Sequence, residues 1–226
     1  MSDHFTADGD ITATATAVLA LAGRPTDTTA LDRFRHEDHY YTYPNELQPS
    51  LTTTAHALHA HALHAPTTHR PPAPTEPALG FLRNRQDTHG RWTGDKWHTS
   101  WIYTTAQVVT ALPTDPATPH AIRALLDAQH PDGGWGAHRH AGAGETGYAV
   151  LALHRVDNPP DATAKALARA GRWLTSWQES GDACDCLLWT GKEPYCPRRV
   201  DRIVALAALL TTTRHTRTRN PNPAHR

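Results

Sequence analysis

Two carboxylates, Asp8 and Asp10, lie one residue apart in the stretch "DGDITATA", just before a run of small and apolar residues that predicts a helix. An aspartate at a helix start commonly accepts a backbone hydrogen bond, which stabilises the helix by about 1 kcal/mol. A desolvated carboxyl can instead stay neutral and donate a proton, and two neighbouring carboxyls can share one proton. The pattern leaves both roles open.

Aromatic side chains are concentrated in a second stretch, "WTGDKWHTSWIY", at residues 92–103. An aromatic face stabilises a cation by about 0.5–2 kcal/mol without capturing it. Trp97, Trp101 and Tyr103, with His98 beside them, are therefore candidates to line a pocket for a cationic intermediate. Each is as readily explained as an ordinary buried core residue.

The basic residues are almost all arginine, and the only lysines are Lys96, Lys165 and Lys192. Lys96 and Lys192 fall inside aromatic-flanked motifs. A lysine is a compact cation that suits a diphosphate, so these two are candidates to bind an anionic substrate group. The alternative is that both are solvated surface lysines.

Histidines recur in "AHALHAHALHAPTTH", where two pairs have the i, i+3 spacing that allows a shared metal ion: His56 with His59 and His61 with His64. The four side chains do not share one helix face, and the whole chain contains 17 histidines. We therefore attribute them to composition and predict no metal site.

The totals exclude several classes of protein. The 226 residues carry a formal net charge of zero, which argues against a nucleic-acid partner. No run is long and apolar enough to span a membrane, and no secretory signal precedes the acid pair, so a cytoplasmic location is expected. Cys184, Cys186 and Cys196 are an odd, clustered set that favours reduced thiols over a disulfide framework.

Helical periodicity dominates the chain, and no segment alternates convincingly like a strand. An all-α fold is predicted, with one domain over residues 1–212 and a basic, disordered tail over 213–226. The expected helices are residues 11–22, 51–64, 77–86, 100–112, 117–129, 144–155, 162–178 and 198–212.

An internal repeat is the strongest sign of organisation. "QDTHGRW" begins at Gln86 and "QHPDGGWG" at Gln129, and both have glutamine, three residues, glycine, one residue and tryptophan. The glycine permits a tight turn, while the glutamine and tryptophan can satisfy backbone groups at helix ends. We assign Trp92 and Trp135 mainly to bracing pairs of helices.

These motifs resemble the class II terpene cyclases, which include squalene-hopene cyclases and bacterial diterpene cyclases. The resemblance is carried by "DGDITA", "GRWTGDKWHTSWIYTTAQVVTAL", the repeat with "ETGYAVLAL", and "LWTGKEPYCPRRV". Their order matches the C-terminal half of a bacterial diterpene cyclase. The resemblance implies an α/α toroid of antiparallel helices that is incomplete in this chain.

The resemblance also implies a reaction. Asp10 aligns with the family's proton donor and Asp8 with its flanking partner. The implied substrate is a linear prenyl compound, most closely geranylgeranyl diphosphate, and the implied reaction is an isomerase-type cyclisation in terpenoid biosynthesis. No cofactor is expected in this chain, although Mg²⁺ can accompany a diphosphate in a complete enzyme.

The sequence departs from the family pattern at two positions. Ile11 stands where the acid motif has a further aspartate, and Thr54 stands where the family has an asparagine near the acid. Family members are also much longer. These departures leave open a non-catalytic or relic helical module, and a second polypeptide that supplies the missing helices.

A further alternative is a protein prenyltransferase β-subunit, which shares the double helical ring and binds zinc. Asp182, Cys184 and His215 can be read as its ligands. An Asp-x-Cys pair is too short to be specific, and the complete cyclase motifs favour the first interpretation.

Overall fold

The computed structural model describes residues 6–64, 75–180 and 187–219. Contacts divide the chain into two compact units, Met1–Asp87 and Thr88–Arg226. The first contains the acid motif, and the second contains the aromatic stretch. The candidate residues are thus carried by two different bodies of the protein.

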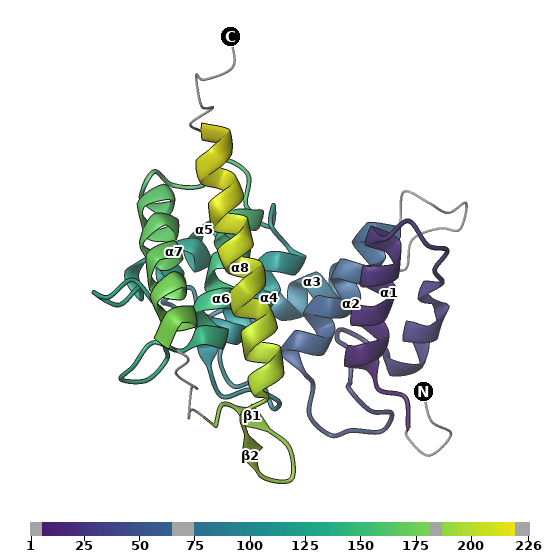
Figure 1. The fold of residues 1–226 in the computed structure, drawn as a ribbon. Helices are drawn as coiled ribbons and strands as arrows, with labels where there is room; N and C mark the ends of the chain where they lie inside the picture. The colour runs from purple at the N-terminus through teal and green to yellow at the C-terminus, as the bar shows by residue number, and fades with distance from the viewer. Residues whose placement is uncertain (1–5, 65–74, 181–186, 220–226) are drawn as a thin grey trace. The chain divides into compact units, whose positions relative to one another are not determined.

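The first unit is built on two parallel neighbouring helices, α1 (Gly9–Leu21) and α2 (Leu51–His64). The 3₁₀ helix η1 (Thr28–Phe34) packs against both, and α3 (Glu76–Asn84) packs against α2 (Figure 1). Apolar side chains from η1 and α2 form the core, with Leu31, Phe34 and Leu58 buried. This packing fixes α1, which begins at the acid motif, against α2.

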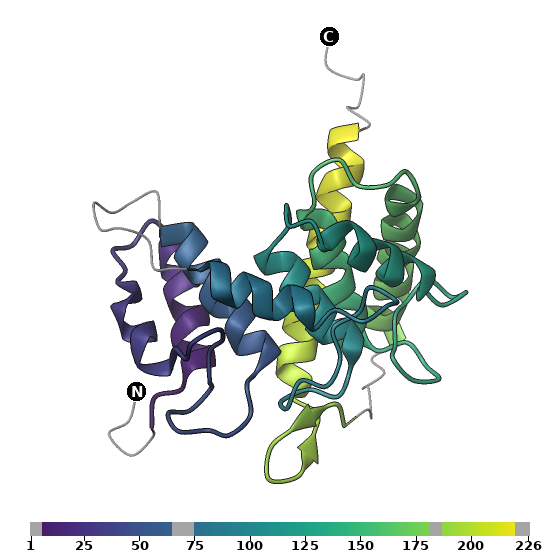
Figure 2. The same ribbon diagram turned by 180° about the vertical axis from the view of Figure 1, so that it is seen from behind.

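The second unit has two helical layers (Figures 1 and 2). One layer contains α4 (Trp101–Ala111), α6 (Ala143–Arg155) and α8 (Arg198–Arg219), and the other contains α5 (Thr118–Asp127) and α7 (Ala162–Ser180). A short hairpin of β1 (Trp189–Thr190) and β2 (Pro194–Tyr195) precedes α8. Within the described residues, helices dominate both units, which confirms the all-α prediction and the toroid-type packing.

Glycine allows α8 to approach α6 closely. A Cβ atom at Gly147 would lie 2.7 Å from Val204 Cγ1 and 2.9 Å from the Val204 carbonyl carbon. Such distances are too short for any side chain larger than hydrogen. The "GETGY" segment therefore sets the spacing of the layer that contains both helices.

The two repeats have the bracing role that their sequence predicts. Trp135 is fully buried and donates its indole N–H to the Leu125 carbonyl at the end of α5, at 2.7 Å. Gln129 donates to the carbonyls of Gly133 and Ala166, both at 2.9 Å. The indole of Trp92 is equally buried. The repeats thus tie helix ends to neighbouring helices.

Sequence-based boundaries agree with the structure to within two residues, except at the end of α8. That helix continues to Arg219 rather than ending at 212, and residues 220–226 lie outside the described part of the chain. Neither η1 nor the hairpin was expected, because neither has a helical stripe or an alternating strand pattern. Among the described helices, none is long and apolar enough to cross a membrane.

Candidate active site

Asp8 is the N-cap of α1. Its Oδ1 accepts the backbone N–H of Ile11 at 2.7 Å, and its backbone is extended. Of the two roles that the sequence left open, the cap is therefore the one that Asp8 fills. Ile11 itself points outward, with 60% of the residue exposed.

Asp10 lies in the first turn of α1 and contacts α2. Its Oδ1 is 2.8 Å from Nδ1 of His56 and accepts a longer hydrogen bond of 3.4 Å from the Thr53 hydroxyl. The side chain of Asp10 remains 31% exposed and that of His56 16% exposed. These contacts are made possible because α1 and α2 lie side by side.

His56 is a functional candidate that the sequence did not reveal. Its Nδ1 also lies 3.5 Å from the hydroxyl of Thr14, one turn beyond Asp10 on α1. The sequence suggested only a metal role for this histidine, because its partner is 46 residues away along the chain. The contact that gives His56 its candidate role is made between α1 and α2, and not with another histidine of α2.

The environments of the two carboxylates move their pKa values in opposite directions. Burial raises the pKa of Asp8 above its ordinary value, and the nearby charge of Asp10 adds to this effect. Burial also acts to raise the pKa of Asp10, but the charge and hydrogen bond of His56, with help from Thr53, outweigh it and lower that pKa. In this geometry His56 therefore stabilises the carboxylate form of Asp10.

A loop holds the start of α1 in place. The Gly9 N–H donates to the Thr42 carbonyl at 2.7 Å, and the Thr42 hydroxyl lies 2.9 Å from that of Thr53. A Cβ atom at Gly9 would come within 2.6 Å of the Tyr41 carbonyl oxygen, so the glycine permits this approach. Thr54 faces the same loop and accepts the Tyr40 N–H at 3.0 Å.

The second unit gathers a separate aromatic cluster, which comprises His98, Tyr103, Tyr148, Trp189 and Tyr195. His98 stacks on Tyr103 with ring centroids 4.0 Å apart, and Tyr148 meets Tyr103 edge-on at 4.8 Å. Trp189 contacts both His98 and Tyr103, at 5.0 and 5.1 Å, and lies 6.4 Å from Tyr195. The sequence found the first two members, while the others come from two further family motifs.

Backbone pairing brings this cluster together. The Thr99 N–H donates to the Leu188 carbonyl at 2.8 Å, and the Thr190 N–H donates to the Trp97 carbonyl at 3.0 Å. His98 is 3% exposed, and its Nδ1 accepts the Ser100 N–H at 3.0 Å. Burial lowers the pKa of His98 to about 3, so its ring is neutral.

The remaining candidates are placed less centrally. Trp101 is half-buried with the Arg91 guanidinium 4.3 Å above its ring, and the Lys96 ammonium lies 5.4 Å from the ring of Trp97. Lys192 is exposed in the turn of the hairpin. Asp182 and Cys184, with the side chain of His215, lie outside the described residues, so the zinc alternative stays a prediction.

A buried polar contact fixes the beginning of α4 against α6. The Ser100 hydroxyl donates to Glu145 Oε1 at 2.5 Å, and the same oxygen accepts the Ala137 N–H at 2.8 Å. Burial raises the pKa of Glu145, which these hydrogen bonds partly oppose. Because Ser100 also caps α4, the contact positions the helix that carries Tyr103.

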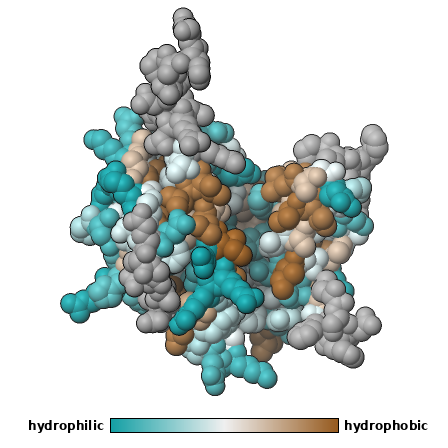
Figure 3. All heavy atoms as spheres, in the orientation of Figure 1, coloured by the Kyte–Doolittle hydropathy of each residue, from teal (hydrophilic) through white to brown (hydrophobic). Residues whose placement is uncertain are grey.

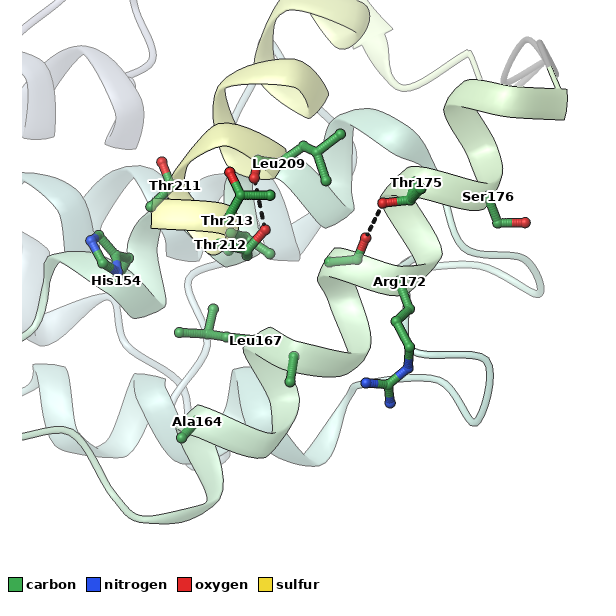
Figure 4. A pocket seen from close by; sticks show the side chains of 13 residues that line it. His154, Ala164, Leu167, Arg172, Thr175, Ser176, Leu209, Thr211, Thr212 and Thr213 are labelled. Carbon is green, nitrogen blue, oxygen red and sulfur yellow. Dashed lines mark hydrogen bonds between the residues drawn. The ribbon is translucent and has the colours of Figure 1, made fainter. Parts of the chain in front are cut away.

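A groove of about 480 Å³ opens among α6, α7 and α8 in the second unit (Figure 4). Leu167 and Leu209 line it from two helices, together with threonines of α7 and α8. The Thr175 and Thr212 hydroxyls donate to carbonyls of their own helices, at 2.9 Å each. None of the sequence-predicted site residues lines this groove.

Comparison with known proteins gives a consistent set of relatives. The family model for the squalene-hopene cyclase C-terminal domain matches residues 46–145. The chain is 40% identical over 218 residues to (+)-kolavenyl diphosphate synthase of Herpetosiphon aurantiacus, covering 94% of this chain and 40% of the relative. It is 37% identical over 217 residues to ent-copalyl diphosphate synthase of a Streptomyces species, covering 92% and 42%.

Comparison with solved structures also gives terpene cyclases as matches. The ent-copalyl diphosphate synthase of Streptomyces platensis matches with a TM-score of 0.80 and 29% identity, over 94% of this chain and 43% of that one. A type II terpene cyclase of Scytonema in complex with geranylgeranyl dihydroxybenzoate shares the fold, with a TM-score of 0.65 at 15% identity, over 91% and 72% of the two chains. This chain spans about two fifths of the length of the curated relatives given above.

Proposed function

We propose that this chain, which belongs to the class II terpene cyclase family and is diterpene cyclase-like, supplies the proton-donating part of a diterpene cyclase site, with Asp10 as the acid. The proposed substrate is geranylgeranyl diphosphate, because the relatives named above are diphosphate synthases. The observation that carries the proposal is the 2.8 Å contact between Asp10 and His56.

His56 makes Asp10 a stronger acid. An alkene is a very weak base, so the donor must leave behind a well-stabilised carboxylate. His56 and Thr53 both reach the Asp10 oxygen and lower its pKa, so each protonated Asp10 gives up its proton more readily. The drawback is that fewer Asp10 side chains hold a proton at neutral pH.

Asp8 partly offsets the low fraction of protonated Asp10. Its raised pKa keeps a proton longer than an ordinary aspartate does, and its charge is coupled to that of Asp10. The pair can therefore retain one proton near the reacting carbon. Ile11 supplies no third carboxylate, so we expect reprotonation of Asp10 to depend on Asp8 and water.

The reaction proceeds without breaking the diphosphate ester. The Asp10 O–H bond breaks as a C–H bond forms at the distal alkene, which leaves a carbocation on the substrate. Ring closures follow, and loss of a proton ends the sequence. Aromatic side chains such as Tyr103 and Trp189 are the proposed walls for the cation, and Lys96 and Lys192 the proposed partners of the diphosphate.

The test assays this chain after it has been joined to the remaining helices of a full-length class II cyclase, in place of the matching segment of that enzyme. Geranylgeranyl diphosphate is added, the products are treated with phosphatase, and the alcohols are identified by mass spectrometry. Asp10→Asn should reduce turnover by at least about a thousandfold, since it removes the proton donor while keeping the shape. His56→Phe should also lower kcat, since the carboxylate loses its partner.

Asp157→Asn is the matched control, because Asp157 is exposed and lies in the second unit. It should leave turnover unchanged. Cyclisation that survives Asp10→Asn would rule out Asp10 as the acid. A wild-type chain that folds with the complete cyclase but yields no cyclic alcohol would rule out catalysis altogether.

A non-catalytic partner role is the second candidate, and an exposed apolar face on α1 favours it. Ile11, Val18, Leu19 and Leu21 are all exposed there, and Figure 3 shows hydrophobic residues gathered over α1. Further cyclase helices are the proposed cover, in the same polypeptide or a second one. Copurification of a helical partner with a chain that lacks turnover would support this role.

A further inference from the structure

Three potential metal ligands lie together on the loop between η1 and α2. His36, Asp38 and His39 each offer one ligand atom, and these atoms all lie within 4.8 Å of one another. A tight turn brings them together, since Arg35 and Tyr40 pair across it and the His36 N–H donates to the His39 carbonyl at 2.8 Å. The three residues fall in the short segment "HEDH", which contains no family motif.

The buried imidazole of His39 supplies an independent reason to expect a ligand. Its side chain is only 10% exposed, and its Nε2 is buried with no hydrogen-bond partner. Its Nδ1 lies 2.6 Å from Asp38 Oδ1. With Nδ1–H donated to Asp38, the other nitrogen carries a lone pair that no protein group satisfies, which is unfavourable in a buried site.

The surroundings fix the ring of His39 and leave room for further ligands. Tyr41 meets the ring edge-on at 4.6 Å, and Phe81 of α3 lies 5.2 Å from it. A polar cavity of about 380 Å³ lies beside Asp38 and His39, so water can complete a coordination shell. His36 and Asp38 are exposed and therefore free to adjust their positions.

We infer that His36 and Nε2 of His39 bind a divalent transition metal ion of the zinc class, while Asp38 orients the His39 ring through Nδ1. Two imidazole nitrogens, completed by water, form a donor set that suits such ions better than Mg²⁺ or Ca²⁺, which prefer oxygen ligands. Ligand atoms around zinc lie about 2.0–2.2 Å from the metal, so the loop must contract slightly on binding. The inference is independent of the proposed cyclase activity.

Metal binding at this loop would brace the acid site. The loop continues into Tyr40, whose N–H is bound by Thr54 of α2, and into Thr42, whose carbonyl binds Gly9 at the start of α1. Thr42 also contacts Thr53, which donates to Asp10. The proposed ion is thus a positioning element for the first unit and takes no part in the chemistry.

The test measures Zn²⁺ binding to the full chain, purified without a histidine tag and stripped of metal. Isothermal titration should show one Zn²⁺ equivalent in the wild type that is weakened at least about tenfold, or lost, in His36→Ala/Asp38→Ala. Both substituted residues are exposed, so the fold should persist, as circular dichroism without metal will verify. His39→Ala is less informative alone, because it also removes buried packing.

The matched control is His138→Ala/Asp157→Ala, which removes the same residue types from exposed positions elsewhere. It should bind the equivalent as the wild type does, even if other histidines of this chain take up zinc weakly. Zn²⁺ should also slow hydrogen exchange in residues 35–42 of the wild type and not of His36→Ala/Asp38→Ala. Equal zinc stoichiometry and affinity in the wild type and that variant would overturn the inference.

Discussion

Two histidines, one in each unit, show how surroundings decide what the same side chain does. His56 lies in a polar, partly exposed setting with Nδ1 2.8 Å from the carboxylate of Asp10. His98 lies in a dry aromatic cluster, where Nδ1 accepts a backbone N–H and burial lowers its pKa to about 3. The first setting favours a charged side chain and proton transfer. The second keeps the histidine ring neutral.

Taken each by itself, the two settings suit different chemical tasks. A cyclase needs a place where a proton is released and walls that stabilise a cation without accepting its proton. The acid site, which comprises Asp8, Asp10, Thr53 and His56, has the properties of the first. The aromatic cluster has the properties of the second, because its histidine stays neutral and its rings pack closely.

The largest expected effect is on the aromatic cluster. Tyr103 is buried and contacts His98, Tyr148 and Trp189, so Tyr103→Ala should lower the free energy of unfolding by about 3 kcal/mol or more. All seven tryptophans lie in the second unit, so urea denaturation followed by tryptophan fluorescence reports on that unit alone. Tyr103→Phe retains the ring and should lose much less. Equal losses in the two variants would show that ring packing is not the source of stability.

The next effect is a dependence of the second unit's stability on pH. The pKa of His98 is about 3 when folded and 6.5 ordinarily, so the unfolded chain binds the proton more strongly between these values. Stability of the second unit should therefore fall as pH drops below 6.5, by about 1.4 kcal/mol per unit and about 2 kcal/mol between pH 7 and pH 5. Tryptophan fluorescence in urea at the two pH values measures it, and His98→Gln should remove this part of the slope.

Asp10 gives the same sign of dependence, but at lower pH. Its folded pKa lies below the ordinary value, so its contribution is present above the unfolded pKa and is lost as pH falls through the folded pKa. Between pH 7 and pH 5 this carboxylate should contribute an unchanged amount. A His98→Gln variant that keeps the full wild-type slope would mean that other groups, not this cluster, set the acid sensitivity.

The sequence predicts those features that depend on residues close together in the chain. The helices, the cap before α1 and the bracing by Trp135 follow from spacing, side-chain type and turn residues within a short window. The contact of Asp10 with His56 and that of Tyr103 with Trp189 do not, since each joins residues that are far apart along the chain. They depend on which helices become neighbours.

A smaller effect concerns the cap. Asp8→Ala removes the acceptor for the Ile11 N–H and should destabilise α1 by about 1 kcal/mol, while Asp8→Asn should retain most of the capping bond. The first unit has no tryptophan, so hydrogen exchange of a peptide covering residues 9–21 is the suitable measurement. Faster exchange in Asp8→Ala alone is expected. Equal exchange in wild type and Asp8→Ala would mean that the cap contributes nothing.

The smallest effects on stability are expected at the two lysines. Lys192 is exposed in the hairpin turn, so Lys192→Ala should change the free energy of unfolding by less than about 0.5 kcal/mol. Lys96 lies near the ring of Trp97, and Lys96→Ala should lose about 0.5–1 kcal/mol.

Binding separates these structural effects from a functional one. If either lysine contacts the substrate diphosphate, its alanine variant should raise the KM for geranylgeranyl diphosphate in the full-length cyclase context and leave kcat nearly unchanged, since uniform binding is lost. Arginine at the same position should restore part of the affinity because it retains the charge. Lys165→Ala is the control, because Lys165 is an exposed lysine on α7. If Lys165→Ala raises the KM as much as Lys96→Ala or Lys192→Ala does, neither Lys96 nor Lys192 binds the diphosphate, and both are ordinary surface charges.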